Sequence, residues 1–166
     1  MRCSIHGFSL PELLVVIAMI SIVSSAFLNS DPPNLFDIWL ARQANQQEVD
    51  GLLTLIERAR SLSVQSGKEV RLCGGEHCDG NWSEQASLRF ASSTIERHFF
   101  QQNTRIRWQG FPTQRRYILF LPTGLSSYQN GSFYICSENS QAQRLLMNQS
   151  GRAYLDDQSY EVSKCL

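Results

Sequence analysis

One carboxylate lies at the start of a strongly apolar segment near the N-terminus. Glu12 is followed at once by the apolar residues 13–23. A charged group in the middle of a membrane costs about 2.5 to 3.5 kcal/mol and is retained mainly where it has a partner. The sequence therefore predicts a charge interaction for Glu12.

The cationic partner of Glu12 would arise if the chain were cut after Gly7. Residues 1–7 carry Arg2 and His6 but no acid, so this leader is expected to stay cytoplasmic. Cleavage would place a new amine on Phe8, four residues before Glu12. Within one straight helix the two groups neutralise each other poorly, whereas the amine and carboxylate of two staggered helices can pair.

The element that would position these groups is a helix over residues 8–28. At 1.5 Å per residue it is about 30 Å long, roughly the hydrocarbon thickness of a bilayer. We therefore predict a transmembrane segment at 8–30 after a leader at 1–7. The residues 30–34 then interrupt the helix, because Pro32 and Pro33 remove backbone donors.

A second helix is predicted within residues 31–66, resuming at Leu35. Apolar residues recur there at helical spacing and form one side to bury: Val49, Leu52, Leu53, Ile56 and Ala59. Gly67 is expected to end the helix, because it tolerates positive φ.

From Gly67 onward the apolar period is two, which predicts an antiparallel β-sheet domain over residues 67–166. The fold class is α+β, with a long N-terminal helix packed on this sheet. The expected strands are Glu69–Cys73, Ser87–Ala91, Arg105–Gln109, Arg116–Leu121, Ser132–Cys136, Gln143–Asn148 and Ala153–Leu155.

Composition argues against an enzyme. The 166 residues leave room for one soluble domain, and 15 basic residues balance 15 acidic ones. No Gly-x-Ser-x-Gly elbow, P-loop or motif-like acid pair occurs. We expect no catalytic residue, cofactor or metal, and a structural or binding role.

The N-terminal residues resemble a known processing signal. Gly7, Phe8, Ser9, Leu10 and Glu12 are similar to the type IV pilin and pseudopilin motif, in which a prepilin peptidase cuts after the glycine and methylates the next residue. The resemblance implies processing at Gly7 and Phe8 and assembly through Glu12. The alternative is an ordinary signal peptide cleaved after residues 24–26, against which Pro11 and Glu12 argue.

Later fragments resemble the GspH/FimT group of minor pilins and pseudopilins. They are residues 59–61, Gly67 to Cys73, Phe120-x-Pro122-x-Gly124, Gly131-x-Phe133-x-x-Cys136 and residues 150–152. The resemblance implies a single-pass inner-membrane protein with a periplasmic C-terminal domain, found in the fibre or pilus tip after assembly. Its implied partners are the prepilin peptidase, other pilins or pseudopilins and the inner membrane.

Four cysteines lie in the part expected to face the periplasm. An even number in an oxidising compartment predicts two disulfides, and of three pairings the spacing favours Cys73–Cys78 and Cys136–Cys165. A zinc site at Cys73, His77 and Cys78 is the alternative, but its spacing matches no common zinc pattern.

Two stretches are candidates for DNA contact. The first, residues 97–117, interleaves aromatic residues with Arg105, Arg107, Arg115 and Arg116 and contains no acid, which suits phosphate contact and base stacking. The alternative is that strand alternation buries the aromatics and leaves the arginines on a solvated face.

The second is Gly151-Arg152, with Arg144 nearby. It is similar to the Gly-Arg-x-Arg motif of DNA-binding FimT-like proteins, although Tyr154 replaces the second arginine. Taken together, the sequence predicts a FimT-like minor pilin of a type IV pilus that contacts DNA. The alternatives are a GspH-like pseudopilin of type II secretion and, for residues 151–152, a turn with a surface arginine.

Overall fold

A computed structural model describes residues 9–28, 35–136 and 141–165 of the chain. The chain divides into two compact units, residues 1–37 and residues 38–166. Gly7, Phe8 and the proline-containing break at 30–34, all singled out above, lie outside the described residues.

The first unit contains helix α1, Leu10–Leu28. The side chains described in it, from Leu10 to Ser25, are all exposed. Its serine hydroxyls donate to backbone carbonyls three or four residues earlier, for example Ser21 Oγ to Ile17 O at 2.9 Å. None of the helices in the described ranges has the length and apolarity needed to cross a membrane. The transmembrane segment at 8–30 stays a prediction.

Helix α2, Leu35–Ser66, carries the apolar stripe that the spacing predicts. Val49, Leu52, Ile56 and Ala59 are at most 1% exposed, and Leu53 is partly buried. The helix ends at Gly67, whose φ of 63° is the left-handed conformation that glycine adopts at low cost.

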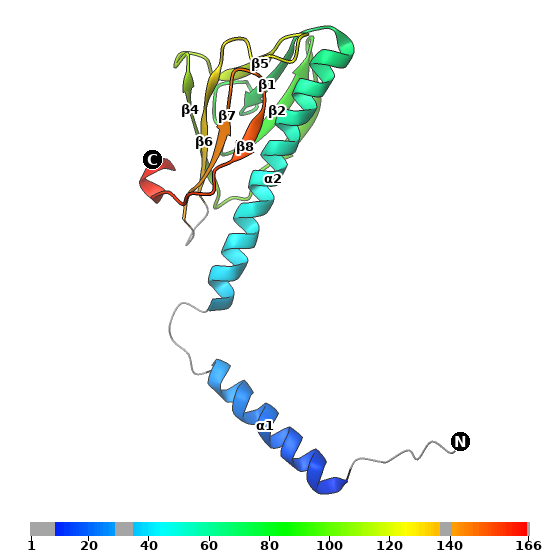
Figure 1. Ribbon diagram of the computed structural model, residues 1–166, viewed down its shortest axis with the longest axis vertical. Coiled ribbons are helices and arrows are strands. Elements are labelled where there is room, and N and C mark those ends of the chain that lie inside the picture. Colours follow the sequence, from blue (N-terminus) through cyan, green and yellow to red (C-terminus); the bar gives the residue numbers. More distant parts are fainter. Residues whose placement is uncertain (1–8, 29–34, 137–140, 166) are drawn as a thin grey trace, which may run out of the picture. The chain divides into compact units, whose positions relative to one another are not determined.

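The second unit also contains two four-stranded antiparallel sheets beside α2 (Figure 1). The first sheet has the order β3-β2-β1-β5 and the second the order β4-β6-β7-β8. The strands are β1 Val70–Gly74, β2 Gln85–Phe90, β3 Ser93–Phe99, β4 Arg105–Phe111, β5 Tyr117–Phe120, β6 Asn130–Cys136, β7 Gln143–Met147 and β8 Ala153–Leu155. A 3-10 helix, Val162–Cys165, ends the described chain.

One apolar core joins α2 to both sheets. Leu72 and Ile118 contribute from the first sheet, Phe133 and Leu145 from the second, and Leu52 from α2; each is fully buried. Burying such a side chain stabilises a fold by about 1.5 to 3 kcal/mol. The amphipathic stripe of α2 is thus covered by sheet, as the α+β prediction requires.

The structure differs from the sequence prediction in two respects. The strands form two sheets instead of one, and β3 was not predicted. β3 is an edge strand in which only Glu96 and His98 are partly buried, so its sequence lacks the apolar alternation that marks a half-buried strand. The other seven strands lie within two residues of their predicted bounds.

Candidate functional site

Glu12 lies in the first turn of α1 and contacts Ser9, the residue just before the helix. Its Oε2 accepts from the backbone nitrogen and the hydroxyl of Ser9, at 3.5 and 3.4 Å. Residues spaced in this way form a capping box, in which a carboxylate at the third helical position satisfies an otherwise unpaired backbone donor. The Ser-x-x-Glu spacing could have indicated this local role, which the sequence analysis missed.

The four cysteines of the second unit form two disulfides. Cys73 is joined to Cys78, five residues on, and Cys136 to Cys165, 29 residues on. These are the pairs that the spacing favours. The long bridge attaches the C-terminal 3-10 helix to β6, and that helix also contacts β4.

Arg144 is occupied by contacts within the domain. Its Nε donates to Ser132 Oγ at 2.9 Å and its Nη1 to the Tyr160 hydroxyl at 3.0 Å, and Asp156 Oδ2 lies 3.5 Å from Nη1. The hydrogen bond to Tyr160 is the main reason that the pKa of Arg144 is raised, with Tyr134 and Asp156 adding to it. Arg144 therefore fastens the C-terminal tail to the sheet, and this use competes with the predicted DNA contact.

The same cluster of residues lowers the pKa of Asp156. The Tyr160 hydroxyl donates to Asp156 Oδ2 at 2.7 Å and, more than any other contact, lowers the pKa of this carboxyl below its ordinary value of 3.8. The backbone nitrogen of Gln158 and the charge of Arg144 lower it further. The tail is thus held by an ionised acid as well as by the long disulfide.

The basic and aromatic stretch 97–117 does not form one surface. Phe100 is buried and Trp108 packs on Phe133 with ring centroids 4.5 Å apart, as the alternative predicts. Phe99 and Phe111, by contrast, are each 66% exposed. The solvated-face alternative is right for Phe100 and Trp108 and wrong for Phe99 and Phe111, and Tyr117, the fifth aromatic of the stretch, is half-buried.

Strand β3, whose last residues begin this stretch, is attached to α2 by two contacts. Arg58 Nη1 lies 2.6 Å from Glu96 Oε1, which raises the pKa of Arg58, and His98 Nε2 lies 3.3 Å from Glu48 Oε2. A Cβ on Gly51 would lie 2.5 Å from the His98 ring, so a larger residue there would require the ring to move from its place beside Glu48. These contacts lay outside the sequence predictions because Glu48 and His98 are 50 residues apart.

The predicted arginines fall into separate groups. Strand register places Arg107, Tyr134 and Arg144 in one row across the second sheet, and Arg105 is exposed on the same face. Arg115 donates to Ser127 O and Oγ at 3.4 and 3.2 Å, while the neighbouring Arg116 is exposed. A groove of about 450 Å³ brings Arg107 together with Trp108 and Phe111.

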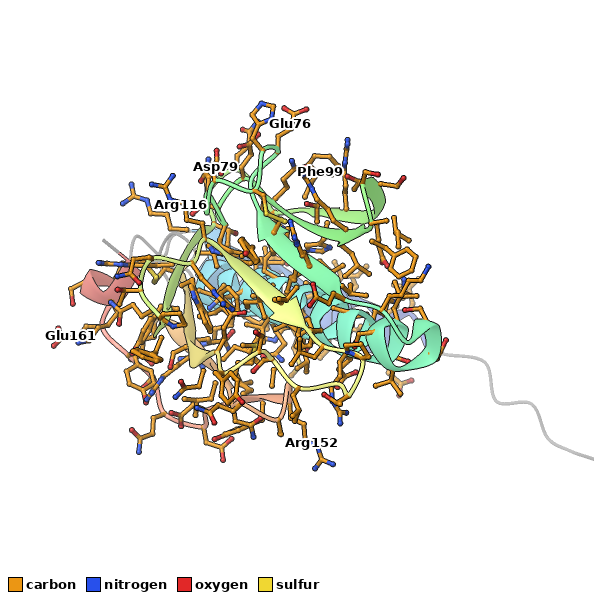
Figure 2. All side chains as sticks on the ribbon, turned by 90° about the horizontal axis from the view of Figure 1, so that it is seen from above. Glu76, Asp79, Phe99, Arg116, Arg152 and Glu161 are labelled. Carbon is orange, nitrogen blue, oxygen red and sulfur yellow. A yellow bond between two sulfur atoms is a disulfide. The ribbon has the colours of Figure 1, made fainter. Side chains whose placement is uncertain are left out.

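Arg152 lies elsewhere, on a groove of about 640 Å³ beside α2. Figure 2 shows Arg152 and Arg116 extending from different sides of the domain. The groove is lined by the turn after β7 and by the last turns of α2, including Arg60 and Val64. The structure therefore adds Arg60, which sequence distance had hidden, to the residues near Arg152.

Gly151 fixes the turn that carries Arg152. It has φ of 73°, and a Cβ there would lie 2.3 Å from Gly124 O and 3.4 Å from Arg60 Cδ. Any other residue would be strained and would collide with backbone. The Gly-Arg pair is thus a close-packed turn beside α2 that also exposes an arginine.

Comparison with known proteins decides the family. Residues 2–28 match the prokaryotic N-terminal methylation motif, and residues 48–151, more than half of the chain, match the family described as type II transport protein GspH. The chain belongs to the GspH family. Together the two matches cover the processing signal, α1, more than half of α2 and strands β1 to β7. A GspH-family chain with this motif is a pilin-like protein, a minor pilin or pseudopilin of a type IV pilus or type II secretion system.

Solved structures show the same fold. Two crystal forms of the type IV minor pilin FimU of Pseudomonas aeruginosa match with TM-scores of 0.58 and 0.55 at 17% and 16% identity. The matches cover 71% and 69% of this chain and 93% and 95% of FimU. At this identity they establish that the GspH-family domain has the type IV pilin fold. None of the curated proteins matches the chain.

Proposed function

We propose that this GspH-family chain is a FimT-like minor pilin of a type IV pilus. It is inserted once in the inner membrane with its C-terminal domain in the periplasm, and it is cut after Gly7 and methylated on Phe8. It then enters the pilus or the tip complex that initiates it. The observation that carries the proposal is the methylation-motif match over residues 2–28, which ends where α1 ends.

Glu12 is proposed to act in assembly. Its contacts with Ser9 are long, at 3.4 and 3.5 Å, and its side chain is exposed, so a stronger cationic partner can compete for it. The methylated amine of a neighbouring subunit supplies such a cation. In an apolar surrounding, an ion pair between Glu12 of one subunit and the amine of its neighbour favours one axial register between the two subunits.

A pseudopilin of type II secretion is the second candidate, favoured by the description of the matching family. The Gly151-Arg152 turn and the two disulfides favour the pilus. A deletion strain separates the two: loss of surface pili with normal export of secreted enzymes supports the pilus role. Loss of export with intact pili would contradict it.

Processing is tested on the protein from the membrane fraction. Mass spectrometry of the N-terminal peptide is expected to find methylated Phe8. A mature chain that begins at Phe27 would instead support an ordinary signal peptide.

Contact with DNA is the further part of this proposal. Arg152 is exposed, lies beside Arg60 on one groove, and extends outward in Figure 2. Arg105 and Arg107, with exposed Phe111, supply a second cationic and aromatic region, and Arg116 is a separate exposed cation. Because the net charge is zero, binding is expected to be weak. Because the arginines would contact phosphates, binding is expected to be independent of base sequence.

Duplex DNA titrated with the full-length protein in detergent micelles tests this contact. Arg152→Gln is expected to weaken binding equally on unrelated sequences and to lower the slope of log K against log salt by about one. Lys164→Gln removes an exposed cation from the tail and is the matched control. If the wild-type protein shows no salt-sensitive binding, the DNA contact is wrong and the pilin role is unaffected.

A further inference from the structure

Each sheet of the domain has two edge strands, and three of these four edges are protected. On β5, Gln129 Nε2 donates to Tyr117 O at 2.8 Å and Leu119 N donates to Gln129 Oε1 at 2.7 Å. The Gln129 side chain, only 1% exposed, thus takes the place of a neighbouring strand. β8 has three residues, and β3 carries Glu96 and is irregularly paired with β2. Short length, charge and bulges are common protections of an exposed edge.

The fourth edge, on β4, is closed only near its start. Ile106 N donates to Ser83 Oγ at 2.8 Å, and Ser83 Oγ donates to Ile106 O at 3.2 Å. The backbone of Ile106 therefore faces away from β6, and because this direction alternates along a strand, the backbones of Trp108 and Gly110 face the same way. A Cβ on Gly131 would lie 2.5 Å from Gly110 Cα, as expected for a close pair without hydrogen bonds between the strands.

The open part of this edge is the backbone of Trp108 and Gly110. On the side away from β6, neither residue has a backbone partner within residues 35–136 and 141–165. Both residues are partly exposed, and β4 is the outermost strand of the second sheet (Figure 1). Cys136, the last residue described before 137–140, pairs with Arg105, so Trp108 and Gly110 lie about 10 to 17 Å farther along the strand.

The side chains at this edge provide an apolar surface with a cation at one end. Trp108 and Phe111 line the groove of about 450 Å³, and Phe111 is 66% exposed. The Trp108 indole lies over Gly110, where a Cβ would collide with the ring. Arg105 is exposed at the other end of β4 and forms no ion pair with a described acid.

We propose that the open edge of β4 pairs with an extended acidic segment of another protein. The added strand exchanges hydrogen bonds with the backbones of Trp108 and Gly110, which is the mode of binding called β-strand addition. An apolar side chain of the segment packs on Phe111, and an acid lies near Arg105.

Charge favours this occupant over a second copy of the chain. Residues 97–117 contain no acid, so two paired β4 strands would bring the arginines of both onto one face. The proposal rests neither on the pilus role nor on DNA contact. DNA would compete with the segment for Arg105, but only the segment pairs with the backbone of β4.

The test uses the full-length protein in detergent micelles, labelled with nitrogen-15, and the peptide acetyl-Asp-Asp-Thr-Val-Thr-Val-amide as the probe. The backbone amide signals of Trp108 and Gly110 are expected to shift saturably and to exchange more slowly, because each amide gains an acceptor. The dissociation constant is expected to be on the order of millimolar, since few residues pair. The same peptide methylated at every backbone nitrogen keeps its side chains but cannot donate, and it is expected to bind at least tenfold more weakly.

Four variants separate this edge from the edge at β3. Phe111→Ala and Arg105→Gln are each expected to weaken binding about twofold to fivefold, the range of an exposed cross-strand pair or ion pair. The matched controls are Phe99→Ala and Arg97→Gln on β3, because Phe99 is also 66% exposed and Arg97 is also an exposed arginine. Both controls should leave the dissociation constant unchanged. All four positions are exposed, so the fold is retained.

Several results would overturn the proposal. Absence of any shift would show that the edge takes no strand, and equal binding of the methylated peptide would show contact through side chains alone. Shifts at Phe99 and Arg97, with none at Trp108 and Gly110, would place the contact on β3. In the protein without peptide, Trp108 and Gly110 amides that shift on dilution would show that a second copy occupies the edge, and amides that already exchange slowly in the monomer would show that another part of this chain does.

Discussion

Helices α1 and α2 differ in whether their apolar side chains are buried. The described side chains of α1 are all exposed, with Leu13 at 53% and Ile20 at 60%, whereas Leu52 and Ile56 of α2 are fully buried. Leucine contributes to folding only where its surface leaves water or is packed. The apolar surface of α2 therefore stabilises this domain, and that of α1 is available for partners outside its unit.

The largest expected effect tests the difference in burial between α2 and α1 directly. Leu52→Ala should lower the free energy of unfolding of the domain by about 2 to 5 kcal/mol, because it leaves a cavity in a closed core. Leu14→Ala, the same change on exposed α1, should leave it unchanged. Chemical denaturation followed by the fluorescence of Trp82 and Trp108 measures both. Equal losses in the two variants would contradict the contrast.

The second effect concerns the two disulfides of the unit that contains the sheets. In the chain-entropy estimate, the bridge over 29 residues contributes about 3 to 4 kcal/mol and the bridge over five residues about 2 kcal/mol. Replacing Cys136 and Cys165 by serine should therefore destabilise the domain more than replacing Cys73 and Cys78.

Peptide mapping without reduction checks the pairs themselves. Fragments that join Cys73 to Cys136, or free thiols after periplasmic expression, would show that the pairing is wrong.

These effects also show what the sequence could reveal. The stripe of α2 and seven strands were predicted because period and turn residues are local signals. The sequence could not reveal β3, since the partly buried face of this edge strand carries the polar residues Glu96 and His98 and so shows no apolar period. It could not reveal the division into two sheets either, since strand pairing depends on distant segments.

The candidate site was less predictable than the fold. Arg144 and Arg152 look alike in sequence, but one is bonded to Tyr160 and Asp156 while the other is exposed. Arg60 is 92 residues before Arg152 and shares its groove. Tertiary contacts decide which of the two arginines stabilises the fold, and no short motif contains those contacts.

A smaller effect is expected from the acid that holds the tail. The pKa of Asp156 is lower in the folded protein, so its contribution to stability is present above the unfolded pKa and is lost as pH falls through the folded value. Asp156→Asn should lower the unfolding midpoint at pH 7. It should also make the midpoint decrease less steeply as the pH falls below about 3.8.

Asp157→Asn, next in the chain, is the control for this measurement and should leave the acid limb as in the wild type. Denaturation at a series of pH values compares the two variants. An unchanged acid limb in Asp156→Asn would contradict the role of this carboxyl.

The smallest expected effect on folding is that of Glu12→Ala. The domain should unfold at the wild-type midpoint, because the hydrogen bonds that the structure describes for Glu12 are with Ser9, next to its own helix. Ser9 remains as the N-cap in this variant, and α1 loses the return hydrogen bond of the capping box. Under the proposed function, incorporation into pili should nevertheless fall, which quantitative immunoblotting of sheared pili would measure. Wild-type incorporation would count against the assembly role, and a lowered midpoint would show that the stability of the domain depends on Glu12.

The bridge from Cys136 to Cys165 also determines how the domain would bear tension. Because the bond joins the end of β6 to the last turn of the chain, it closes a covalent ring that contains β7 and β8. A pull between α2 and the C-terminus is transmitted through the two sulfurs, so β7 and β8 lie off the load path. Such a pull does not extend the two strands, and the mechanically loaded part of the domain ends at β6.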